Sequence, residues 1–94
     1  MQIQRSFFTI DETFTLRLPR KAKILHVDTL ANGAHAIWTE VDSTTDTVDH
    51  VFMCFETGET IEPHDGTYVG TVIAAGAITE HHIYYHGSVE PESE

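Results

Sequence analysis

Apolar and polar residues alternate with a period of two along most of the chain, a pattern typical of strands with one buried face. In one segment, Phe14, Leu16 and Leu18 alternate with Thr15 and Arg17. No segment places apolar residues at i, i+3, i+4 and i+7 over three helical turns. The pattern therefore predicts an all-β protein.

Turn signals separate seven segments that have this strand pattern. Asn32-Gly33 is the clearest turn, because both residues tolerate the positive φ that tight hairpin turns require. Pro19 ends a strand, because it lacks the N–H that a β-ladder uses. The expected strands are residues 2–10, 13–18, 22–29, 34–41, 48–56, 67–74 and 77–86.

Some expected strands are apolar on both faces, as where Val51 and Met53 alternate with Phe52 and Cys54. Such strands are buried on both sides in a sandwich, in a barrel or at a subunit interface. A chain of 94 residues has room for one core. We expect a small antiparallel sandwich or barrel of six to seven strands over residues 1–86, followed by an acidic flexible tail at 87–94. Strands that are apolar on both faces also favour a homodimer or higher homo-oligomer, in which a subunit interface covers the second face.

The single cysteine, Cys54, lies within an apolar run, so we expect a buried, unreactive thiol rather than a nucleophile or a metal ligand. No apolar run approaches the 18 or so residues of a membrane span. The first residues also lack the basic-then-apolar layout of a signal peptide. These features predict a soluble, intracellular protein that does not associate with membranes.

Charge is distributed unevenly in a chain whose formal net charge is −10. Residues 1–23 hold all five Lys and Arg and two carboxylates, whereas residues 24–94 hold thirteen Asp and Glu. Direct nucleic-acid binding is disfavoured, because phosphate contacts require many cations. A basic protein surface is the more natural partner, since complementary potentials speed encounter. A simpler alternative is that the negative charge only maintains solubility.

Two sets of residues are candidates for binding such a partner. Tyr84 and Tyr85 are adjacent on an expected strand, so one of them must point away from the core. Tyrosine is enriched at interfaces, whereas we expect Trp38 to pack in the core. The carboxylates that flank one expected turn and its two strands form the predicted acidic patch: Glu40, Asp42, Asp46, Asp49 and Glu56.

The basic residues support a different class of function. Four of the five cations lie between Thr15 and Val27, namely Arg17, Arg20, Lys21 and Lys23. Arginine forks suit phosphate, so an oligomer that holds a phosphate-bearing signalling nucleotide between its subunits is an alternative. A virion or assembly component, whose sheet edges meet other copies, is another.

Seven histidines raise the question of a metal site, for which His64, His82 and His86 are weak candidates. The chain lacks the closely spaced Cys and His pairs of structural zinc sites, so we expect core or solvated histidines and no cofactor. A pH-sensitive interface remains an alternative. No nucleophile elbow or phosphate loop is present in the sequence, which favours a protein that is not an enzyme.

Five short motifs, in matching order and spacing, resemble a family of short uncharacterised proteins encoded by tailed phages and prophages. They are Pro19–Leu25, Trp38–Asp42, Glu56–Glu59, Tyr68–Thr71 and His82–Tyr84. The family often has Gly and His where Glu56 and Glu59 stand, so a role of that histidine does not carry over. The resemblance implies a non-enzymatic accessory protein of the infected bacterial cytoplasm. Such a protein would bind and inhibit a host protein, for example a defence or nucleic-acid-processing complex.

Overall fold

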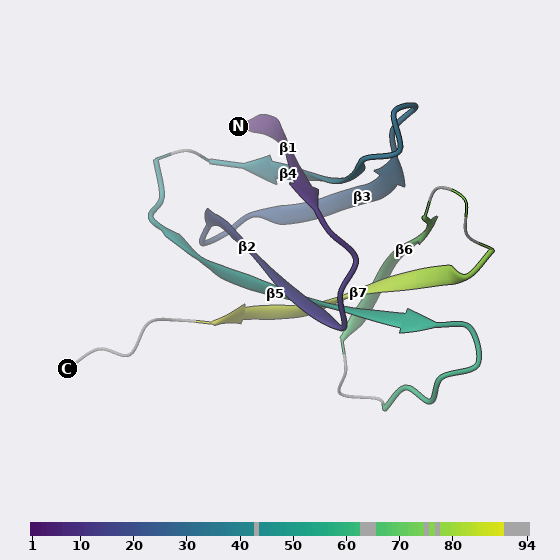
Figure 1. Ribbon diagram of the computed structural model, residues 1–94. Helices are drawn as coiled ribbons and strands as arrows, with labels where there is room; N and C mark the ends of the chain where they lie inside the picture. Colours follow the sequence, from purple (N-terminus) through teal and green to yellow (C-terminus); the bar gives the residue numbers. More distant parts are fainter. Residues whose placement is uncertain (43, 63–65, 75, 77, 90–94) are drawn as a thin grey trace.

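The computed structural model describes residues 1–42, 44–62, 66–74, 76 and 78–89 (Figure 1). The predicted all-β fold is confirmed, and the described residues include no helix. The strands are β1 (Gln2–Phe8), β2 (Thr13–Pro19), β3 (Lys23–Thr29), β4 (His35–Val41), β5 (Thr47–Glu56), β6 (Thr67–Ile73) and β7 (Glu80–Val89). Among the described residues there is accordingly no helix with the length and apolar character of a membrane crossing.

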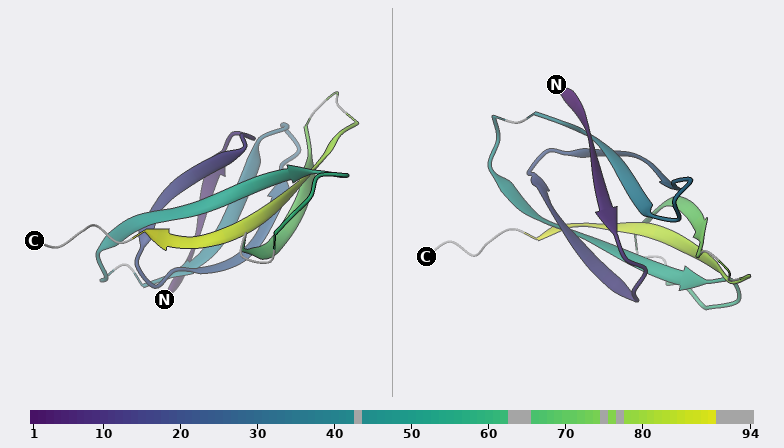
Figure 2. Two further views of the ribbon diagram at one scale, coloured as in Figure 1. Left: turned by 90° about the horizontal axis from the view of Figure 1, so that it is seen from below. Right: turned by 45° about the horizontal axis from the view of Figure 1, so that its top comes forward.

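The strands form two antiparallel sheets that pack as a sandwich (Figures 1 and 2). Sheet A has the order β1-β4-β3, and sheet B has the order β2-β5-β7-β6. Every paired strand runs antiparallel to its neighbour. Of the two architectures that the alternation allowed, the sandwich is the one that forms.

The core lies between the sheets and is built from the inward residue of each alternating pair. Ile37 of sheet A and Phe52 and Ile83 of sheet B are fully buried. Phe14 stacks on Phe52 at a ring-centroid distance of 5.1 Å, and Phe8 stacks on Phe14 at 4.6 Å. Burying an aliphatic or phenylalanine side chain contributes about 1.5–3 kcal/mol, so this stack and its neighbours supply much of the stability.

The expected boundary between the β domain and the tail, at residue 86, is too early. β7 continues through Gly87 and Ser88 to Val89, because Asp49, His50 and Val51 of β5 provide ladder partners for these residues. The remainder of the expected tail, residues 90–94, lies outside the described residues, as do Ala75, between the last two expected strands, and Ala77, the first residue of the last one.

The edge strands β3 and β6 lie against each other along the seam between the sheets. There Gly70 of β6 contacts Val27 of β3 so closely that a β-carbon on Gly70 would overlap the Val27 side chain. On the N-terminal side of this contact each strand has a register shift against its own sheet, at Leu25 in β3 and at Val69 in β6. Such bulges bend strands, so the two edges diverge beyond the contact.

Candidate functional site

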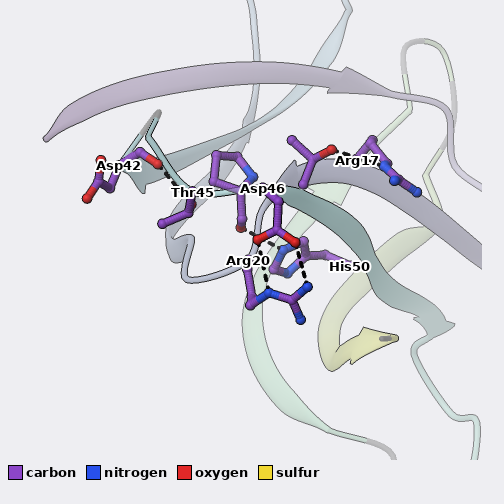
Figure 3. Close-up of polar contacts among 8 residues, drawn as sticks. Arg17, Arg20, Asp42, Thr45, Asp46 and His50 are labelled. Carbon is purple, nitrogen blue, oxygen red and sulfur yellow. Dashed lines mark hydrogen bonds and ion pairs between the residues drawn. The ribbon is translucent and has the colours of Figure 1, made fainter. Parts of the chain in front are cut away.

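The turn that follows β2 is held by an arginine–carboxylate pair (Figure 3). Arg20 donates from Nε to Asp46 Oδ1 at 3.1 Å and from Nη2 to Asp46 Oδ2 at 2.7 Å. Three residue pairs further into the sheet, Arg17 Nη1 lies 3.3 Å from Asp49 Oδ1. Arg17 and Asp49 are cross-strand partners of β2 and β5, so the register itself creates this pair.

Hydrogen bonds hold two carboxylates of the turn between β4 and β5 in the ionised form. The bond from Arg20 is the main cause of a lowered pKa of Asp46, and the same bond raises the pKa of Arg20. Asp42 accepts hydrogen bonds from the Thr44 hydroxyl at 2.7 Å and from the Thr44 backbone N–H at 3.0 Å. These two bonds lower the pKa of Asp42.

The structure does not bring the five residues of the predicted acidic patch together. Asp42 and Asp46 lie in the turn before β5, and Asp49 lies near the start of that strand, whereas Glu56 ends it. Asp49 and Glu56 are seven residue steps apart along the strand, which corresponds to about 23 Å. Glu40 lies in the other sheet, opposite Lys23 of β3.

The four predicted phosphate-binding cations do not converge either. Arg17 and Arg20 bind Asp49 and Asp46. Lys21 lies exposed in the turn between β2 and β3, while Lys23 lines a separate cleft described below. Two of the four cations are therefore neutralised by carboxylates in the fold. Arg17 and Arg20 would have to release Asp49 and Asp46 to bind the phosphate of a nucleotide.

A different set of carboxylates gathers at the opposite end of sheet B. The segments that form this end contain no Lys or Arg. Two pairings bring these segments together. The Cys54 N–H donates to the carbonyl of Glu12 at 3.0 Å, and Glu56 pairs across the β5–β7 ladder with His81, the neighbour of Glu80. We call this set the acidic end: Asp11, Glu12, Glu56, Glu59 and Glu80. Only Glu56 belonged to the predicted patch, because the pairing that joins the other four residues is not local in sequence.

A chain of hydrogen bonds crosses the outer face of sheet B and finishes at the acidic end. It joins Tyr68 Oη to Thr71 Oγ1 at 2.6 Å, Thr71 to His82 Nδ1 at 2.8 Å, His82 Nε2 to Thr57 Oγ1 at 2.8 Å, and Thr57 to Glu80 Oε1 at 2.8 Å. A carboxylate only accepts, so Thr57 donates to Glu80 and His82 donates from Nε2 to Thr57. When the second ring nitrogen of His82 carries no proton, it accepts from Thr71, which accepts from Tyr68.

The histidines offer no metal centre within the part of the chain that the structure describes. No group of three or more His, Cys, Asp or Glu side chains is placed there to hold an ion. Both ring nitrogens of His82 are engaged by threonines, and His86 also has an interaction partner. His64 lies outside the described residues.

We call the end of sheet B where Arg17 and Arg20 bind Asp49 and Asp46 the paired end. A buried histidine anchors this end from the inside. His50 is 1 % exposed, and its Nε2 lies 3.0 Å from the carbonyl oxygen of Pro19 (Figure 3). Because a carbonyl only accepts, Nε2 carries the proton, and Nδ1 accepts from the Tyr85 hydroxyl at 2.8 Å. Burial raises the pKa of Tyr85.

The two predicted contact tyrosines therefore have different environments. Tyr85 points between the sheets, towards His50. Tyr84 points to the outer face of sheet B, where it makes edge contacts with Phe55 at 5.5 Å and with Tyr68 at 5.6 Å. Tyr68, which is 53 % exposed, is the aromatic side chain most open to a partner on this face. The sequence pattern does not single out Tyr68, because a lone tyrosine on an edge strand has no distinctive pattern.

A cleft of about 370 Å³ opens where β3 and β6 diverge. Residues 22–25 and 67–69 form its walls together with Tyr85. Lys23 is the one charged side chain among these lining residues. Cys54 lies away from this cleft, buried at 7 % exposure as expected, and burial raises the pKa of its thiol.

The expectation that Trp38 packs in the core is wrong. Its neighbours Ile37 and Thr39 occupy the inward positions of β4, so Trp38 lies half-buried on the outer face of sheet A. There its ring contacts His26 of β3 at a centroid distance of 5.8 Å. The alternation showed that Trp38 and Ile37 face opposite ways, but it did not show which face meets sheet B.

The family model of a domain of unknown function (DUF7352) matches residues 1–94, and the chain therefore belongs to that family. This match confirms the expected membership of an uncharacterised domain family. No curated protein and no solved structure matches the chain.

Proposed function

We propose that this DUF7352 member is a non-enzymatic binding protein that docks the acidic end of sheet B on a basic protein surface. One observation carries the proposal. The five carboxylates of the acidic end come from segments without Lys or Arg, whereas Asp46 and Asp49 at the other end are bound to arginines. Unpaired negative potential attracts and orients a positively charged partner.

Exposed aromatic side chains next to the acidic end support the same function. Tyr68 and Tyr84 lie beside one another on the outer face of sheet B, and the hydrogen-bond chain links Tyr68 to Glu80. Interfaces commonly combine a central aromatic contact with a charged rim. Tyr68 would supply the contact area and the carboxylates the orientation.

The geometry favours binding over catalysis. Thr71 donates to His82 in the manner of an activated hydroxyl, but it lies on an exposed strand face and its oxygen already accepts from Tyr68. The cleft between β3 and β6 is lined by residues 67–69 and not by Thr71 or His82. The resemblance to phage-encoded proteins makes a host defence or nucleic-acid-processing protein the partner to seek, with inhibition as the outcome.

Affinity capture from bacterial lysate tests the proposal when the same bait is used at low and high salt. We expect the captured partner to be lost at high salt, because exposed charge pairs are screened. The variant Glu12→Lys/Glu56→Lys should weaken its recovery by about tenfold or more. The matched control, Glu90→Lys/Glu92→Lys, makes the same change in net charge outside the described residues and should retain the partner. The proposal is contradicted when the recovery of the partner is the same at low and high salt and the same with the wild-type bait and both variants.

A further inference from the structure

The outer face of sheet A is a regular grid of three rows of side chains. Residues directly opposite one another on paired strands point to the same side of a sheet. The register places one residue of β1, one of β4 and one of β3 in each row. The rows are Ile3, Glu40 and Lys23; Arg5, Trp38 and His26; and Phe7, Ala36 and Asp28. We call these nine residues the sheet A face.

The sheet A face exposes large apolar side chains to solvent. Ile3 is 66 % exposed and Phe7 is 53 % exposed, and half-buried Trp38 lies between their rows. Sheet B covers only the opposite side of sheet A, where Ile37 and Val27 enter the core. Apolar residues that gather on one face with polar residues around them mark interaction surfaces.

The charges of this face balance, unlike those of the chain as a whole. Arg5 and Lys23 offset Asp28 and Glu40, which gives a formal charge of zero on the face of a chain that carries −10. The charged groups also lie close to their neighbours: the Arg5 guanidinium carbon is 4.9 Å from the centre of the Phe7 ring, and His26 Nε2 is 3.5 Å from Asp28 Oδ2. Two copies of so acidic a chain repel each other in general, but they can meet on this face without net repulsion.

We propose that the sheet A face is the interface of a symmetric homodimer, in which two copies pack face to face through Ile3, Phe7 and Trp38. A two-fold interface uses the same patch on both copies, so it requires self-complementary charge, which this face has. The acidic end belongs to sheet B and stays exposed on both copies. The dimer would therefore present two identical acidic ends, but its formation does not depend on what they bind.

The size of the face sets the strength of the dimer. Three strands of seven residues cover about 14 Å by 23 Å. That is smaller than the standard interface of about 800 Å² per partner, so the dimer should dissociate in the micromolar range. We expect a monomer–dimer equilibrium rather than an obligate pair.

Sedimentation velocity over a concentration series tests this, with tryptophan fluorescence as the second readout. Trp38 is the only tryptophan, so its emission should shift to shorter wavelength as the dimer forms. The variant Ile3→Thr/Phe7→Thr keeps charge and strand propensity but removes the exposed apolar surface. It should weaken dimerisation by about tenfold or more. The control Ile73→Thr changes an apolar side chain that is 48 % exposed on β6 and should leave the equilibrium unchanged.

A charge variant separates this face from other modes of association. Arg5→Glu gives the face a charge of −2, so the dimer should weaken at low salt and recover as salt screens the repulsion. Circular dichroism checks that each variant retains the β fold. A chain that stays monomeric to about 1 mM overturns the proposal. So does a dimer that forms without a change in Trp38 emission or that persists unaltered in Ile3→Thr/Phe7→Thr.

Discussion

Carboxylates lie at both ends of β5, but the two ends differ in what surrounds them. At the start of the strand, Asp46 and Asp49 are bound by Arg20 and Arg17. At its end, Glu56 pairs across the ladder with His81 and has other carboxylates nearby. The same strand therefore has one end in which arginines bind the carboxylates and one in which the carboxylates come from segments without Lys or Arg. Strand register, rather than charge density along the sequence, determines this difference.

The interior at the paired end is also polar. His50 bridges the Pro19 carbonyl and the Tyr85 hydroxyl, so β5, β7 and the end of β2 share one buried hydrogen-bond network. At the acidic end, by contrast, the hydrogen bonds of Thr57 to His82 and Glu80 lie at the surface. The paired end should accordingly be far more sensitive to substitution than the acidic end.

Replacement of the buried histidine should have the largest effect. His50→Leu leaves the Pro19 carbonyl and the Tyr85 hydroxyl without a partner, and each unsatisfied buried group costs about 1–3 kcal/mol. We expect the free energy of unfolding, measured by urea denaturation, to fall by about 2–5 kcal/mol. The control His82→Leu, at the exposed network, should cost about 1 kcal/mol or less. Equal losses in the two variants would contradict the contrast between the ends.

The second-largest effect should come from lowering the pH, which should reduce the stability that the carboxylates of the turn before β5 contribute. The pKa of Asp46 and that of Asp42 are lowered in the folded protein, so the ionised carboxylates add stability above their unfolded pKa. That stability is lost as the pH falls below about 4, through the folded values. Denaturation midpoints measured across this range should therefore fall with pH. Asp46→Asn and Arg20→Gln should both reduce the dependence, because each removes the hydrogen bond that lowers the pKa of Asp46; an unchanged slope in both would oppose this assignment.

The second arginine pair should contribute much less than the buried network. Arg17 and Asp49 are 64 % and 50 % exposed, and exposed ion pairs contribute about 0–1 kcal/mol. A double-mutant cycle with Arg17→Gln and Asp49→Asn should give a coupling free energy below about 1 kcal/mol that shrinks in high salt. A larger coupling would show that the pair supports the fold as His50 does.

Charge reversal at the acidic end should scarcely change stability. Glu56 is exposed, so Glu56→Lys should alter the free energy of unfolding by about 0.5 kcal/mol or less. Thermal or urea unfolding measures this directly. A large loss of stability would mean that the carboxylates of this end serve the fold, and the contrast with the paired end would no longer hold.

Most of the strands could be predicted from alternation, because burial of one face imposes a period of two regardless of the partner. The end of β7 could not, since Ser88 and Val89 are held by β5 rather than by a pattern of their own. The acidic end was missed for a related reason. The segments of Glu12, Glu56 and Glu80 come together only after Glu12 has paired with Cys54, 42 positions away, and Glu56 with His81, 25 positions away.

By itself, the sequence determined that the chain folds into strands, where most of them lie and that Cys54 is enclosed, because these depend on local apolar periodicity and turn residues. Only the tertiary structure decided that Arg17 and Arg20 bind Asp49 and Asp46 and that Trp38 faces outward. It also decided that β3 and β6 diverge beyond Gly70. Each of these depends on the register of strands that are distant in sequence, and a shift of one residue turns every side chain to the other face.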